Sequence, residues 1–158
     1  MPSDNRPAMI KAFLLLLLPL AAIAVRAETC LVVGVSDGDT LTARCGDPGN
    51  YRQVKVRLGE IDAPEKRQPF GERSRQSLAE ICFRRSAEIR SATRDRYGRT
   101  VARVNCAGVD ANADQVRRGM AWIYTRYQTD SSLSRLEMKA RERRDGLWAD
   151  RSPQPPWE

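Results

Sequence analysis

Three short polar segments hold acidic and basic side chains close together along the chain. They are residues 37–40 (Asp-Gly-Asp-Thr), 57–65 (Arg-Leu-Gly-Glu-Ile-Asp-Ala-Pro-Glu) and 95–99 (Asp-Arg-Tyr-Gly-Arg). Taken alone, the first suits a hairpin turn, the second a strand that runs into a polar loop, and the third a charged turn. Together they supply carboxylates and guanidinium groups, which is a combination suited to chemistry on an anionic phosphodiester.

The residue types narrow this chemistry further, because the chain contains no histidine. That excludes Ser-His and Cys-His catalysis and every histidine general acid or base. Hydrolysis of a phosphodiester can instead use guanidinium groups that bind the phosphate oxygens in pairs. A hard cation held by carboxylate and carbonyl oxygens adds charge stabilisation. A carboxylate must then act on the attacking water, and Glu65 is the natural candidate.

The first polar segment lies between two runs of residues that favour β-strands. Asp-Gly between such runs predicts a hairpin, here with that pair as a two-residue loop. Paired positions then sum to 75, so that Cys30 faces Cys45 at a distance that a disulfide can span. Four cysteines allow three pairings, and this register predicts Cys30–Cys45 and, by elimination, Cys82–Cys106. Zinc is disfavoured because the chain has neither Cys-x-x-Cys nor histidine.

The rest of the chain alternates between strand and helix patterns. The patterns predict strands over 53–58, 88–93 and 100–105, an ordered loop over 61–65, and helices over 72–83, 110–118 and 132–144. Five short strands with a helix after the third suit an α+β fold with a mainly β core: a five-stranded OB-type Greek-key barrel with three α-helices. We expect one domain over 28–150 and a loose, proline-rich tail over 151–158.

The first 27 residues have the layout of a cleaved signal peptide. Arg6 and Lys11 precede an apolar run of 13 residues, 12–24, and cleavage would follow Ala24 or Ala27. A membrane anchor is the rival interpretation, but a span needs about 20 apolar residues. Cleavage removes three basic residues and one acidic residue, so the net charge falls from +7 to +5. We therefore expect an exported, periplasmic or secreted monomer without stable membrane association, whose even cysteine count fits that location.

The three polar segments resemble, in order and approximate spacing, the signature segments of the staphylococcal nuclease (thermonuclease) family. Gly119-Met120-Ala121-Trp122 and the late Gly146-Leu147-Trp148 are similar to that family as well. The resemblance covers nearly all of the chain after residue 27. It implies an OB-type barrel with three helices, Ca²⁺ as cofactor, and DNA and RNA, single-stranded or frayed, as substrates that are cleaved to leave 3′-phosphates.

The resemblance also implies roles for individual residues. Asp39 and Asp62 would be calcium ligands, together with the backbone carbonyl of Ala63. Arg57 and Arg99 would hold the phosphate, and Arg99 would also stabilise the leaving oxygen.

Three further roles follow from the same resemblance. Glu65 would act on the attacking water, as a general base or as a group that positions it. Tyr97 and Tyr127 match tyrosines that contact the bound nucleotide, although Tyr127 could equally be a packing residue. Thr125 falls where the family has another such tyrosine, so that stacking could be supplied by Trp122 or Tyr124.

Two other functions compete with a nuclease. A noncatalytic nucleic-acid-binding OB-type module could keep the barrel, but loss of Arg57, Glu65 or Arg99 would be expected in it, and all three are present. A disulfide-stabilised envelope protein that binds calcium or another polyanion would explain the cysteines. It would not explain why two arginines accompany the carboxylates.

Overall fold

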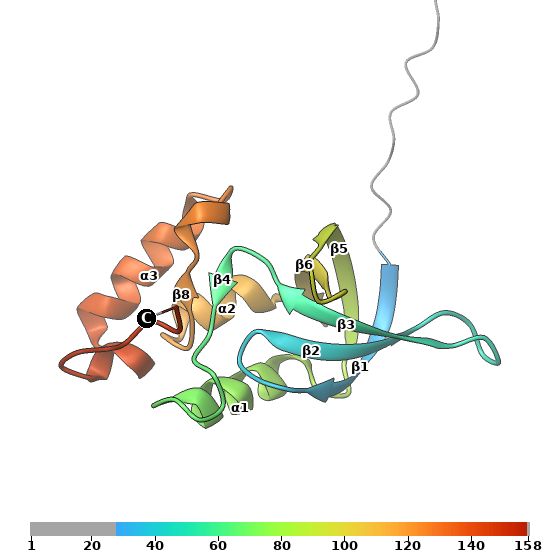
Figure 1. Cartoon of the computed structure of the whole chain (residues 1–158), viewed down its shortest axis with the longest axis horizontal. Coiled ribbons are helices and arrows are strands. Elements are labelled where there is room, and N and C mark those ends of the chain that lie inside the picture. The colour runs from blue at the N-terminus through green and yellow to red at the C-terminus, as the bar shows by residue number, and fades with distance from the viewer. Residues whose placement is uncertain (1–27, 158) are drawn as a thin grey trace, which may run out of the picture.

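The structure is a computed structural model that describes residues 28–157 (Figure 1). The predicted signal peptide therefore lies outside the described residues. Within the described range, no helix is long and apolar enough to cross a membrane.

Five strands form a closed barrel. The sheet order is β3-β2-β1-β5-β6, and a parallel pairing of β3 with β6 closes it at Val56–Thr100 and Leu58–Ala102. Along β6, alternate residues from Thr100 to Cys106 are buried, as expected of a strand with one face in a core. The barrel strands are β1 (Glu28–Val35), β2 (Thr40–Cys45), β3 (Arg52–Leu58), β5 (Ser86–Arg94) and β6 (Thr100–Cys106).

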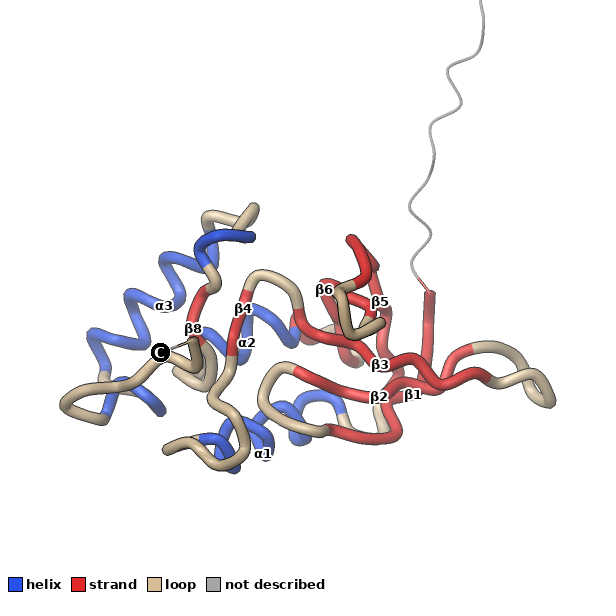
Figure 2. Tube along the Cα trace, viewed as in Figure 1, coloured by secondary structure: helices blue, strands red, loops and turns tan. Residues whose placement is uncertain are grey.

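Three helices accompany the barrel, which confirms the predicted fold class. They are α1 (Gly71–Cys82), α2 (Ala111–Arg117) and α3 (Ser132–Arg143). The helices α1 and α2 pack on barrel strands, and α3 packs on α2. Leu78, Ile81 and Cys82 are the apolar residues of the buried face of α1, and Leu133 and Ala140 are the buried face of α3. Figure 2 shows the barrel strands at one end of the molecule and α3 at the other, with short strands β4 and β8 between them.

The short elements complete the connections between barrel and helices. β4 (Ile61–Asp62) pairs with β8 (Trp122–Ile123), so the segment predicted as a loop over 61–65 begins with a two-residue strand. Its partner is 60 residues away in sequence, which explains why local patterns missed it. The others are β7 (Val109–Asp110) and the 3₁₀ helices η1 (Thr125–Tyr127) and η2 (Gly146–Ala149).

The first hairpin differs from the prediction in two ways that cancel. Its loop is longer than two residues, because the Ser36 N–H donates to the Thr40 carbonyl and Val35 pairs with Leu41. A β-bulge between Val32 and Gly34 then restores the predicted register. Cys30 therefore faces Cys45 after all.

Both predicted cysteine pairs are disulfides in the structure. The Cα atoms are 4.4 Å apart in Cys30–Cys45 and 5.2 Å apart in Cys82–Cys106. The first joins β1 to β2, and the second joins the end of α1 to the end of β6. All four cysteines are buried in the main core, so each bond ties two elements together inside it.

The helix α2 lies within the predicted range 110–118, and specific residues mark both of its ends. The Asp110 side chain caps the helix by accepting the Ala113 N–H, and Gly119 follows with a positive φ of 65°. Asn112, two residues farther along the chain, plays no part in this cap. It is instead fully buried: its amide donates to the Gly59 carbonyl, and its side-chain oxygen accepts the Val104 N–H.

Candidate active site

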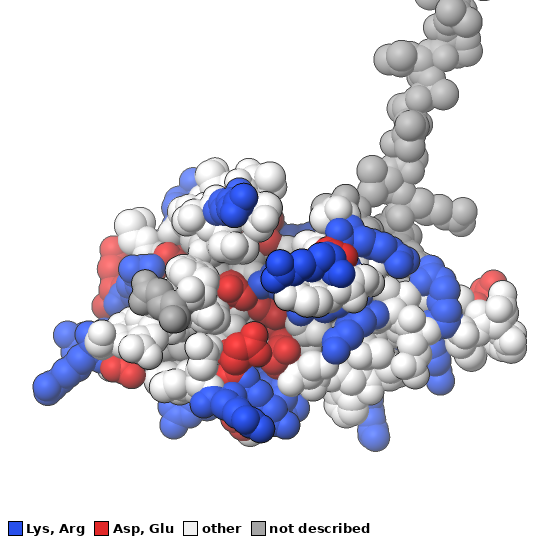
Figure 3. All heavy atoms as spheres, viewed as in Figure 1, with Lys and Arg blue, Asp and Glu red and all other residues white. Residues whose placement is uncertain are grey.

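A cleft of about 610 Å³ opens between the barrel and the short β4–β8 sheet. It brings together five of the predicted site residues: Arg57, Asp62, Arg99, Tyr97 and Tyr127. On the face drawn in Figure 3, acidic side chains gather in the middle, and Lys and Arg side chains surround them. The other residues that line the cleft are Gly59, Glu60, Thr93, Arg94, Asp95, Arg96, Val101 and Tyr124.

Arg57 lies at the centre of a group of carboxylates. One of its terminal nitrogens is 2.6 Å from Asp62 Oδ1 and 3.4 Å from Asp39 Oδ2. Its other terminal nitrogen donates to the carbonyls of Leu58 and Ile61, at 3.1 and 3.0 Å. These contacts fix the guanidinium at the end of β3, with two carboxylates on one edge.

Asp39 lies behind this cluster and is only 6% exposed. Its Oδ2 accepts the Ala63 N–H at 3.0 Å, and its Oδ1 accepts the Thr40 hydroxyl at 2.9 Å. Burial raises the pKa of Asp39, although Arg57 opposes that shift. Burial likewise raises the pKa of Asp62, again against the effect of Arg57.

The neighbouring Asp37 shows how much negative charge the site holds. Burial, and then the charge of Asp39, raise the pKa of Asp37 to about 6. Arg57 binds Asp39 and Asp62, and Asp37 adds a third carboxylate beside Asp39. Such a site has an excess of negative charge in a partly dehydrated place, which a bound cation would neutralise.

The donor set fits a hard cation such as calcium, which binds oxygen ligands. Among residues 28–157, no three His, Cys, Asp or Glu side chains are arranged to hold a metal ion. The predicted set contains only two carboxylates and one backbone carbonyl, so it forms no such group by itself. Water or substrate oxygens would have to complete the six to eight ligands that calcium typically takes.

The turn that carries Asp39 is held from behind by a buried side chain that sequence reasoning missed. The Gln115 amide donates to the carbonyls of Gly38 and Ser74, at 2.6 and 3.1 Å. Gly38 leaves no room for a side chain, because an added Cβ would lie 1.8 Å from the Ser74 hydroxyl oxygen. The fully buried Gln115 therefore positions the turn from α2, 77 residues away in sequence.

Glu65 lies apart from the cleft lining. It is exposed at the start of the loop before α1, and its backbone N–H donates to the Gln68 side chain at 2.7 Å. Burial is the main cause of the raised pKa of Asp62, and the charge of Glu65 raises this pKa further. The structure thus places Glu65 near the carboxylate cluster but not among the residues that line the cleft.

Arg99 and Tyr97 lie on the turn between β5 and β6. Asp95 holds both: its Oδ1 accepts the N–H groups of Tyr97 and Arg99, and its Oδ2 is 2.7 Å from Arg99 Nε. The Tyr97 ring is 68% exposed, and the Arg99 guanidinium lies 5.5 Å from its centroid. This turn therefore presents a cation and an aromatic ring together at the same cleft that Arg57 lines.

The segment with Tyr124 and Tyr127 is anchored to the barrel by Glu60. Its Oε1 accepts the Thr129 N–H and hydroxyl and the Asp130 N–H, and its Oε2 binds Arg103 at 3.0 Å. Partial burial raises the pKa of Glu60, but these hydrogen bonds outweigh burial and lower it overall.

Arg103 extends this anchor to two further acids. It also binds Asp110 and Asp130, at 2.7 and 3.0 Å. Neither Arg103 nor Glu60 was among the predicted site residues. No local pattern connects them, because 43 residues separate them.

Comparison with known proteins agrees with this geometry. The family model described as staphylococcal nuclease homologue matches residues 55–150. A protein named uncharacterized endonuclease, from Haemophilus influenzae, is 40% identical over 149 residues, which cover 94% of this chain and 82% of the relative. A protein named micrococcal nuclease, from Shigella flexneri, is 40% identical over 137 residues, which cover 80% of this chain and 76% of the relative. The chain therefore belongs to the staphylococcal nuclease family.

Proposed function

We propose that this chain is an exported, calcium-dependent nuclease that hydrolyses phosphodiester bonds in DNA and RNA. The relatives named as nucleases support the nuclease activity itself. One observation of the structure carries the choice of active site: Arg57 joins the Asp39 and Asp62 carboxylates at a cleft that Arg99 also lines. Guanidinium groups and clustered carboxylates at one cleft can together supply what hydrolysis of a phosphodiester needs in a chain without histidine.

The two arginines would hold the scissile phosphate between them. Arg57 binds carboxylates, so phosphate oxygens would compete with Asp39 and Asp62 for its donors. Arg99 binds Asp95 through its Nε atom and also lines the cleft, where its other nitrogens could donate to a phosphate. Water would attack phosphorus while the bond to the 5′-oxygen breaks, leaving a 3′-phosphate and a 5′-hydroxyl. Arg99 would stabilise the charge on that leaving oxygen.

Asp39, Asp62 and the Ala63 carbonyl would hold the calcium ion. When bound, the ion supplies charge stabilisation for the phosphate oxygens. The arrangement of the chain suits this assignment, because the Ala63 N–H donates to Asp39 and brings the two segments together. The excess of carboxylates over guanidinium groups supports it as well.

Glu65 would take up or orient the proton of the attacking water. Its loop lies beside Asp62, and its exposure leaves the carboxylate accessible to water and substrate. Tyr97 and Tyr127 would stack against bases on either side of the phosphate, since both rings line the cleft and are more than half exposed.

The two disulfides support export, because such bonds form and persist in oxidising compartments. We propose that the segment before residue 28 is a cleaved signal peptide. The nuclease domain would then span 28–150 and act as a monomer.

The test is cleavage of single-stranded DNA by the mature chain with calcium and then with a chelator. Arg99→Ala is the informative variant, and Arg90→Ala is the control, because Arg90 is an exposed arginine of β5 that pairs only with Glu88 among the described contacts. We expect calcium-dependent cleavage, a loss of at least about 100-fold in kcat for Arg99→Ala, and near-normal activity for the control. Binding without cleavage in calcium, magnesium and manganese would favour the noncatalytic module.

A further inference from the structure

Tyr124 and Tyr127 form an aromatic wall of the cleft, and Trp157 of the tail packs against this wall. The Trp157 ring stacks on Tyr124, with centroids 5.7 Å apart and planes 21° apart. Tyr124 in turn meets Tyr127 edge to face at 5.1 Å. Tyr124 and Tyr127 both line the cleft, so Trp157 continues the same wall by one further ring.

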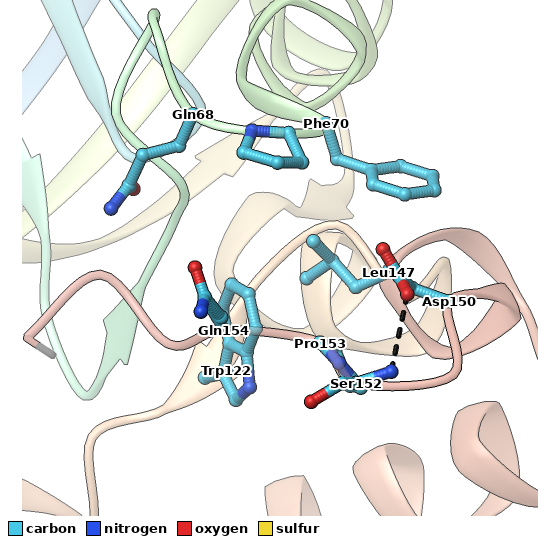
Figure 4. A pocket seen from close by; sticks show the side chains of 9 residues that line it. Gln68, Phe70, Trp122, Leu147, Asp150, Ser152, Pro153 and Gln154 are labelled. Carbon is cyan, nitrogen blue, oxygen red and sulfur yellow. Dashed lines mark hydrogen bonds between the residues drawn. The ribbon is translucent and has the colours of Figure 1, made fainter.

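Other residues of the tail, which the sequence predicted to be loose, line a second cavity. Figure 4 shows Pro153 and Gln154 of the tail beside Trp122, facing Gln68 and Phe70 across a cavity of about 190 Å³. The Trp157 ring also meets Trp122 at 6.4 Å. The tail end thus lies beside β8, where Figure 1 places the C-terminus.

These rings are packed on one side and exposed on the other. Trp157 is 50% exposed and Tyr127 is 57% exposed. An aromatic face that is supported from behind and open in front is what base stacking requires, because every base offers a flat π surface. Arg126 lies 5.7 Å from the centroid of the Tyr127 ring and adds a cation for a neighbouring phosphate.

We propose that Trp157 forms, with Tyr124, a nucleobase subsite that extends the cleft beyond Tyr127. Its ligand is an unstacked base of a single-stranded nucleic acid whose backbone continues out of the cleft. A paired duplex would not offer such a base. This inference rests on the proposed function, because it assumes that nucleic acid occupies the cleft.

If Trp157 binds a base outside the cleft, its loss should weaken the binding of long oligonucleotides but not of short ones. The experiment measures the Kd of fluorescently labelled oligothymidylates of two and eight nucleotides by anisotropy, with a chelator present to prevent cleavage. The variants are Trp157→Ala and Trp157→Phe. Tyr51→Ala is the control, because Tyr51 is an equally exposed ring before β3, at the end of that strand opposite Arg57.

We expect Trp157→Ala to bind the eight-nucleotide DNA at least about fivefold more weakly, the change that corresponds to about 1 kcal/mol of base stacking. Binding of the dinucleotide should not change, Trp157→Phe should recover most of the affinity, and Tyr51→Ala should match the wild type. With calcium, the same loss should appear in KM while kcat stays within about twofold. A melting temperature close to that of the wild type should show that the variants are folded.

Equal affinity of Trp157→Ala and the wild type for the longer DNA would overturn the subsite. Tighter binding by Trp157→Ala would overturn it too, because it would mean that the tail covers Tyr124 and competes with the bases. Cleavage by the wild type in calcium separates this inference from the proposed function. A wild type that cleaves, with an alanine variant that binds normally, refutes only the role of Trp157.

Discussion

Reduction of the two disulfides should remove most of the folding stability of this domain. The bonds close loops with sequence separations of 15 and 24 residues. In the chain-entropy treatment, such loops contribute about 3.0 and about 3.4 kcal/mol. The loops do not overlap, so the two contributions add to about 6.4 kcal/mol. A domain typically has about 5–15 kcal/mol in total, so the reduced protein should be marginally folded.

Urea unfolding of the mature chain, followed with and without a reducing agent, measures this loss. With an m-value of about 1–3 kcal/mol/M, the midpoint should fall by at least about 2 M. The double variant Cys82→Ala/Cys106→Ala keeps the first bond and should lose at least about 3.4 kcal/mol, because the buried sulfur atoms leave a cavity as well. None of the four cysteines lines the cleft, so that variant should keep its kcat at temperatures where it is folded.

An unchanged urea midpoint after full reduction would refute this reasoning. The control is a thiol titration, which must count four free thiols in the reduced sample. A large loss of kcat in the folded double variant would instead show that the Cys82–Cys106 bond shapes the active site through α1.

Three further predictions concern residues around the cleft. Glu60→Ala should lower the free energy of unfolding by about 1–3 kcal/mol, because the anchor of residues 129–130 is lost, and kinetics should show a higher KM as the Tyr127 segment loosens. Gln115→Ala should leave the buried Gly38 carbonyl without its donor, and calorimetry should find weaker calcium binding; unchanged binding would remove its positioning role. Glu65→Gln should lower kcat far more than calcium affinity, and an unchanged kcat would contradict its action on water.

The disulfide pairing shows how a correct prediction can rest on partly wrong local geometry. The sequence pointed to a two-residue loop, whereas the chain makes a longer loop and a bulge between Val32 and Gly34. Residues near the turn are therefore one position out of the predicted register, while Cys30 and Cys45 are in it. The alternation of apolar residues constrains the register along the strands, because a slip by one residue would turn the buried face outward.

Contacts between segments far apart in the chain could not be predicted from the sequence. The strand Ile61–Asp62 exists because Trp122–Ile123 pairs with it, and the turn at Gly38 is held by Gln115 from a helix. No local pattern in the proline-rich tail indicated the contact of Trp157 with Tyr124. In each case the partner lies far along the chain, and local propensity carries no information about it.

The sequence by itself determined the family, the order of most elements, the three polar segments and the absence of histidine chemistry. These features depend on residue types at short spacing, which the sequence shows directly. Only the tertiary structure decided that Arg57 lies between Asp39 and Asp62, that Glu65 stands outside the cleft lining, and that the tail joins the aromatic wall. The physical reason is that barrel closure and helix packing bring together residues far apart in sequence, such as Gln115 and Gly38, which are 77 residues apart. Both depend on the whole core rather than on any one segment.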